Sequence, residues 1–123
     1  SWNPNLETVA VNQAQWMAQK GELVHVGPRG EGLGERVRQA EYRFERVAEN
    51  IAAGYHELEQ VLTAWRNSAK HCRNMLDPRF TEVAVACVKA SNGNPWWAIA
   101  FGRPASQANG ASRTAWFSLP PMR

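Results

Sequence analysis

The chain has 123 residues, of which 44% are hydrophobic and 20% charged, and its formal net charge is +3. This length fits one domain with its own core, and the composition excludes a disordered chain. No apolar run reaches the ~18 residues of a membrane-spanning helix, and the scattered basic residues of segments such as GERVRQAEYRFERVAE argue against a nucleic-acid partner.

The first predicted helix lies in NPNLETVAVNQAQWMAQKG, where apolar residues recur at helical spacing. Asn5 is its expected N-cap, and Gly21 is expected to end it. The following glycine-rich segment GPRGEGLG matches neither GxGxxG nor GxxxxGK[ST], so we interpret it as a flexible connection and not as a phosphate site. A second, short helix is expected over about residues 33–42.

The stretch VAENIAAGY places Glu49 and Asn50 in an otherwise apolar run, directly before the next helical pattern. Taken alone, Glu49 would be a charge in a turn or at a helix end. The next helix is expected in ELEQVLTAW. A further short helix, AKHCRNML, begins after Ser68 and ends at Asp77-Pro78, because the residue before a proline disfavours helical backbone.

Two β-type runs follow, TEVAVACVKA and PWWAIAFG, joined by SNGN, whose Asn-Gly pair is typical of a hairpin turn. The alanines of the first run predict close packing of a helix on the sheet. Residues 103–123 mix Pro, Ser, Gly and Asn without a period, and we expect an irregular tail packed on the surface. Helices first and an antiparallel sheet later indicate an α+β fold.

Several residues invite a catalytic interpretation that their neighbours do not support. Ser68 and His71 share one helix face, but a serine at a helix start is expected to be an N-cap, and no G-x-S-x-G elbow surrounds it. Cys72 is adjacent to His71 on the helix and points elsewhere, so His71 is poorly placed to activate it. Cys72 and Cys87 lie in no metal-ligand spacing, and their number allows either one disulfide or two free thiols.

Four segments in chain order resemble the CAP superfamily, also called the SCP domain, most closely its bacterial branch. They are ELVHVG with His25, AENIAAGY with Glu49, AWRNSAKHCRNML with His71, and DPRFTEVAVAC running into PWWAIAFG. The resemblance covers about residues 2–102, so the domain is expected over 1–102. It implies a three-layer α-β-α sandwich with an open cleft, to which five residues contribute: His25, Glu49, Asn50, Ser68 and His71.

Two departures from the family pattern affect what the cleft can bind. The family often has a second acidic residue after the tryptophan helix, whereas WRNSAK offers none. The resemblance therefore implies an incomplete cluster that binds Zn²⁺ weakly, through His25 and His71. We expect this domain to lack the family's first helix, usually before WNPNLE, and we expect the face that the helix would cover to be a docking surface for a protein partner.

The resemblance implies a secreted, periplasmic or cell-envelope domain that binds a lipid, sterol or peptide without catalysis. The alternative is a metal-assisted hydrolase or protease, in which the two histidines hold the metal and Glu49 takes part in catalysis. Because the family is mostly exported into oxidising compartments, a disulfide between Cys72 and Cys87 is also expected.

Overall fold

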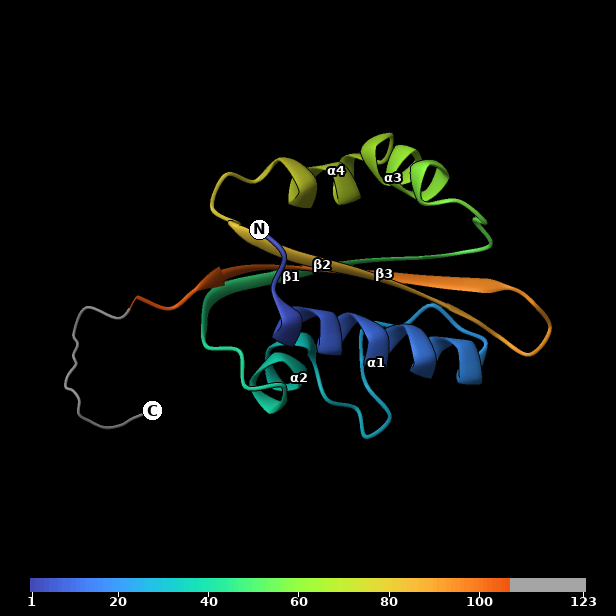
Figure 1. The fold of residues 1–123 in the computed structure, drawn as a ribbon, viewed down its shortest axis with the longest axis horizontal. Helices are drawn as coiled ribbons and strands as arrows, with labels where there is room; N and C mark the ends of the chain where they lie inside the picture. Colours follow the sequence, from blue (N-terminus) through green and yellow to red (C-terminus); the bar gives the residue numbers. More distant parts are fainter. Residues whose placement is uncertain (107–123) are drawn as a thin grey trace.

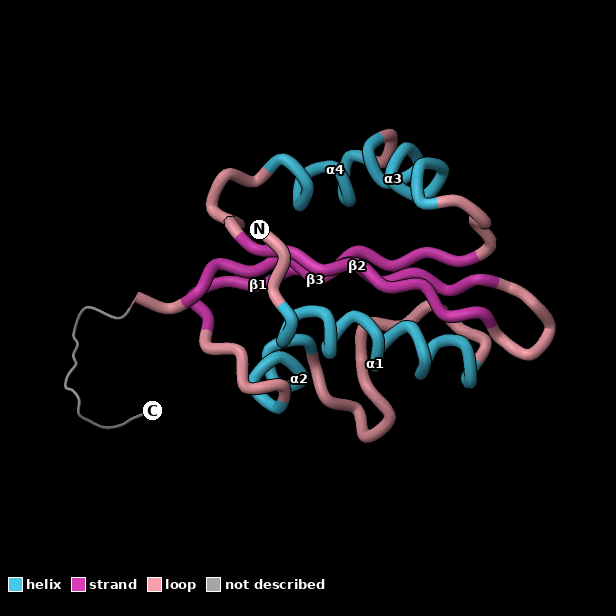
Figure 2. The backbone as a smooth tube through the Cα atoms, viewed as in Figure 1, coloured by secondary structure: helices cyan, strands magenta, loops and turns pink. Residues whose placement is uncertain are grey.

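The computed structural model describes residues 1–106, which form three layers (Figure 1). Two helices lie on one face of the sheet, α1 (Pro4–Lys20) and α2 (Leu33–Gln39), and two on the other, α3 (Leu58–Arg66) and α4 (Ala69–Leu76). The sheet between them consists of β1 (Phe44–Ala53), β2 (Glu82–Lys89) and β3 (Pro95–Pro104) (Figure 2). The predicted α-β-α sandwich is confirmed. Within residues 1–106, no helix is both long enough and apolar enough to cross a membrane.

The sheet is antiparallel throughout, with the order β1-β3-β2. The predicted hairpin joins β2 to β3, and Gly93 takes φ 84° in its turn, a conformation that glycine adopts without strain. The run VAENIAAGY was expected to be a turn or helix start, and this was wrong, because most of it belongs to β1. Alanine, glutamate and asparagine are weak strand formers, so pairing with β3, which aligns Glu49 with Ala100, decides the conformation.

The central strand β3 is buried on both faces because helices cover the sheet on each side. Its small residues Ala98 and Ala100 pack toward α1, together with Ala84 of β2, in clusters that include Leu6 and Met17. Small side chains let the helix approach the sheet closely, as predicted from the alanines of β2. The alternate residues of β3, Trp97, Ile99 and Phe101, pack instead with Val61 and Trp65 of α3.

Helix α1 begins two residues before the expected position. Asn3, not Asn5, is the N-cap, and its side-chain oxygen accepts hydrogen bonds from the backbone N–H groups of Asn5 and Leu6 at 2.8 and 3.1 Å. Pro4 fits the first helical position because the N–H that it lacks would have no partner within the helix. The expected end is confirmed, since Gly21 adopts φ 74° and donates to the carbonyl of Met17.

The second helical layer follows the predicted segments closely. Helix α3 is tied to β1 by Trp65, whose indole N–H donates to the carbonyl of Ile51 at 3.1 Å. Helix α4 ends at Asp77, which takes extended backbone before the proline. Strand β3 continues to Pro104, so residues 103 and 104 belong to the sheet. The rest of the expected tail lies mostly outside the described residues.

Candidate functional site

The candidate site lies along β1, which is an edge strand of the sheet. Glu49 and Asn50 are consecutive on this strand, and successive strand side chains point to opposite faces. Glu49 faces the α1 and α2 layer, where it meets Arg36 of α2, and Asn50 faces α4. The strand therefore presents one polar residue to each helical layer.

Glu49 is the centre of a buried ionic network. Both of its oxygens accept hydrogen bonds from Arg36, each at 3.0 Å, and Oε1 also lies 3.0 Å from Nδ1 of His25. The side chains of Glu49 and Arg36 are only 1% and 7% exposed, whereas that of His25 is 48% exposed. Because a carboxylate can only accept, the Nδ1 of His25 carries the proton, and in the neutral ring Nε2 is left as the acceptor.

The backbone around His25 is held by two buried side chains. Gln13 of α1 donates from its amide nitrogen to the carbonyls of Val24 and Val26, at 2.7 and 3.0 Å. Arg36 donates to the carbonyl between them, that of His25 itself, at 2.6 Å. Three successive carbonyls thus have partners inside the protein, and this fixes the position of the His25 ring at the edge of the sheet.

The glycine-rich segment after His25 is ordered by Glu31, contrary to the expected flexible connection. The backbone N–H of Arg29 donates to the Glu31 carboxylate at 2.6 Å, and the N–H of Gly27 donates to the Glu31 carbonyl at 2.8 Å. Backbone hydrogen bonds hold the pKa of the Glu31 carboxyl below its ordinary value. A Cβ at Gly27 would collide with the Glu31 side chain, so a larger residue there would have to displace the carboxylate that orders this turn.

His71 reaches the site from the opposite layer, on α4. Its Nδ1 lies 2.8 Å from Oγ of Ser68, and its carbonyl accepts a hydrogen bond from Asn50 at 3.1 Å. Asn74 completes this side by donating to the side-chain oxygen of Asn50 at 2.9 Å. Ser68 occupies the expected N-cap position of α4, but its hydroxyl bonds the imidazole and not the helix backbone.

Burial lowers the pKa of the His71 imidazole below its ordinary value, and the nearby charges of Lys70 and His25 lower it further. His71 is therefore neutral at neutral pH. His25 is thus one of the charges that act on His71, although the two side chains come from opposite layers. No described group bonds to the Nε2 atom of either ring.

The structure thus brings His25 and Glu49 into direct contact and places Asn50, Ser68 and His71 on the other side of β1. Sequence reasoning missed Gln13, Arg36 and Asn74. Only Asn74 could have been suspected from the sequence, because it lies three residues after His71 and therefore shares its helix face. Nothing in the sequence distinguishes buried Arg36 from exposed Arg38.

The expected disulfide is wrong: Cys72 and Cys87 are free thiols. Asn50 holds α4 over β1, whereas Cys87 lies on β2 at the opposite edge, with Trp97 of β3 beside it in the register. Cys72 is half-buried on α4 and Cys87 is exposed on β2, and no bond joins their sulfur atoms.

The described residues do not form a three-ligand metal site. Within residues 1–106, no group of three or more His, Cys, Asp or Glu side chains lies in position to hold an ion. Glu49 does not offer a free oxygen to a metal, because both of its carboxylate oxygens already bond to Arg36 and one also contacts His25. Any metal bound here would depend chiefly on the Nε2 atoms of His25 and His71. Weak Zn²⁺ binding through these two histidines stays a prediction.

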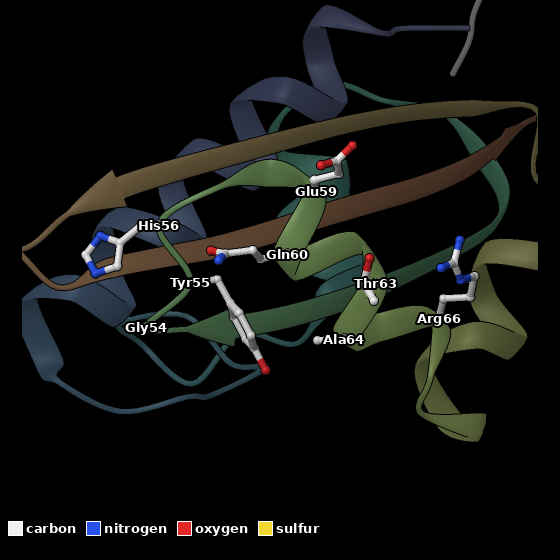
Figure 3. A pocket seen from close by; sticks show the side chains of 8 residues that line it. All are labelled: Gly54, Tyr55, His56, Glu59, Gln60, Thr63, Ala64 and Arg66. Atoms are coloured by element: carbon white, nitrogen blue, oxygen red, sulfur yellow. The ribbon is translucent and has the colours of Figure 1, made fainter.

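Two hollows in the described residues are lined by neither His25 nor His71. An open depression of about 790 Å³ runs along α3, where Tyr55, Thr63 and Arg66 line it (Figure 3). A second hollow of about 370 Å³ lies between α1 and the glycine-rich segment, and Arg36 forms part of its wall. Both are lined by side chains of mixed charge and polarity.

Comparisons with known proteins agree with this geometry. The model of the CAP, cysteine-rich secretory protein family matches residues 1–101. An uncharacterized Bacillus subtilis protein, YkwD, is 31% identical over 84 residues, which are 68% of this chain and 32% of YkwD. The chain therefore spans about a third of that relative, and it spans 24% of the B. subtilis membrane protein YlbC.

Solved structures show the same fold. An outer surface protein of Borrelia burgdorferi superposes with a TM-score of 0.78 over 85% of this chain and 77% of its own, at 22% identity, which concerns the fold alone. An extracellular SCP-domain protein of Bacillus anthracis gives 0.74 at 26% identity, over 84% of this chain and 33% of its own. These relatives are named as extracellular, outer-surface or membrane proteins. The chain belongs to the CAP family, whose SCP domain it forms over nearly all of its described residues.

Proposed function

We propose that this CAP domain is the ligand-binding part of an exported protein and that it does not catalyse a reaction. The observation that carries the proposal is the fixed presentation of two imidazoles. His25 and His71 each use Nδ1 within the protein, at 3.0 Å to Glu49 and 2.8 Å to Ser68, and each keeps Nε2 available. Two preset hydrogen-bonding atoms suit recognition of a polar head group.

The surroundings of His25 favour a ligand with an apolar part. Leu23 and Val26, close to His25 in the same segment, are 52% and 45% exposed. Because Lys70 lies near His71 and Arg36 balances the charge of Glu49, an acidic or neutral head group fits better than a cationic one. A lipid, a sterol or a peptide with an acidic end has this combination of properties.

The hydrolase alternative receives less support from the same geometry. A general base must reach a proton of its substrate, but Glu49 is 1% exposed and paired through both oxygens with Arg36. The Ser68 and His71 pair lacks a third member, since no carboxylate within residues 1–106 bonds to the His71 ring. Export is supported by the relatives named as extracellular or outer-surface proteins.

The test is calorimetric titration with three probes: oleate, cholesterol sulfate and a pool of short acidic peptides. We expect at least one probe to bind the wild type and to lose about 10-fold or more in affinity in the double variant His25→Ala, His71→Ala. His56→Ala is the matched control, because His56 is exposed and lines the depression beside α3.

Turnover is measured in parallel with ester and peptide substrates. A hydrolase that relies on acid-base groups should lose ~10²- to 10⁴-fold in rate when Glu49 is replaced by Gln. Wild-type turnover that disappears in Glu49→Gln contradicts the proposal, as does equal binding of every probe by the wild type and the double histidine variant.

A further inference from the structure

Arg36 holds the position that a metal ion would need in order to reach Glu49. Its two terminal nitrogens lie 3.0 Å from the two carboxylate oxygens, and one of them also donates to the carbonyl of His25 at 2.6 Å. Within the described residues, the remaining nitrogen, Nε, has no hydrogen-bond partner. The guanidinium is therefore anchored by Glu49 and the His25 backbone alone.

A buried carboxylate requires a compensating positive charge, and either a guanidinium or a divalent ion can supply it. With Arg36 present, a metal that approaches His25 meets a like charge within hydrogen-bonding distance of the same carboxylate. It must displace a paired, bidentate guanidinium before it can bind an oxygen of Glu49. The imidazole of His25 already borders this carboxylate, so removal of the guanidinium would leave a carboxylate and an imidazole side by side.

We propose that Arg36 is a built-in counter-ion that excludes divalent metals from the Glu49 and His25 pair. It thereby keeps the site selective for neutral and anionic groups. The inference goes beyond the binding role proposed above and does not depend on which ligand binds at the two histidines.

The variant that tests this is Arg36→Gln, which keeps a polar side chain and removes the charge. We expect Zn²⁺ to bind Arg36→Gln about 10-fold or more tightly than the wild type, because a like charge is removed and a carboxylate is released. Zn²⁺ should also raise the melting temperature of Arg36→Gln by more than it raises that of the wild type. Both gains should disappear in the double variant Arg36→Gln, Glu49→Gln, which has no carboxylate to bind the metal.

Two further variants separate charge exclusion from a loss of packing. Arg38→Gln lies on the same helix, where Arg38 is exposed over the ring of Phe44, and it should bind Zn²⁺ like the wild type. Arg36→Lys keeps the positive charge and should also resemble the wild type. Equal Zn²⁺ affinity in Arg36→Gln and the wild type overturns the proposal, and so does Arg36→Lys binding as tightly as Arg36→Gln. If Arg36→Gln is unfolded alone, folding on addition of Zn²⁺ supports the proposal, and failure to fold at saturating Zn²⁺ contradicts it.

Discussion

Glu49 and Asn50 are neighbours in sequence, yet their side chains serve opposite layers of the sandwich. Glu49 pairs with Arg36 on the α2 side, and Asn50 bonds the carbonyl of His71 on the α4 side. This follows from the two-residue period of a strand. A single Glu-Asn pair thus connects the sheet edge to both segments that carry the histidines.

Asn50 is fully buried and makes two hydrogen bonds, one to the His71 carbonyl and one from Asn74. We expect Asn50→Ala to lower the free energy of unfolding by about 2 kcal/mol, because it removes both bonds and leaves two partly buried partners unpaired. Asn74→Ala removes only one bond and should cost about 1 kcal/mol. Urea denaturation measures both, and an equal or smaller effect of Asn50→Ala would argue against its role in holding α4.

Stability should depend on pH through His71, whose pKa is lowered in the folded state by burial and by the charges of Lys70 and His25. The unfolded chain binds a proton on this residue near its ordinary pKa of about 6.5, before the folded protein does. Stability is therefore fully present above that pH and falls as pH decreases through it toward the folded pKa.

The measurement is the free energy of unfolding between neutral pH and mildly acidic pH for the wild type and His71→Gln. The wild type should lose more stability on acidification than the variant does. A proton titration of the His71 ring by NMR with a midpoint at or above the ordinary value would rule out this explanation.

The two cysteines should be free in the folded protein, because the structure leaves both thiols unpaired. Protein that is purified without reductant and then unfolded should react as two thiols per chain. The single variants Cys72→Ser and Cys87→Ser should each react as one thiol, and each should unfold within about 0.5 kcal/mol of the wild type because neither cysteine is buried in the core. If the unfolded chain has no reactive thiols, the two cysteines form a disulfide and this prediction is wrong.

Local sequence signals predicted the helices and the hairpin because these elements depend on contacts within a few residues. The cap and spacing of α1, the Asp77-Pro78 end of α4 and the Asn92-Gly93 turn are all of this kind. Strand β1 was missed because its partner, β3, lies some fifty residues later in the chain. Its apolar residues also lack clear alternation, since helices cover both faces of the sheet.

The residues of the site were likewise predicted only where a local motif marked them. His25, Glu49 and His71 were predicted from motifs, and their order along the chain supported the family resemblance. Arg36 and Gln13 act through distant partners, Glu49 and the carbonyls around His25, and their own segments do not reveal this. The disulfide was mispredicted because neither the number nor the spacing of the two cysteines decides whether they pair.

The central claim is that ligands bind at the Nε2 atoms of His25 and His71. The most direct measurement is a ¹H–¹³C NMR spectrum of the imidazole groups, recorded at constant pH while oleate, cholesterol sulfate or acidic peptides are added. The account predicts that at least one probe shifts the ring signals of both His25 and His71 and leaves that of His56 in place. If no probe moves these two signals, or if His56 responds equally, the two Nε2 atoms are not the binding site.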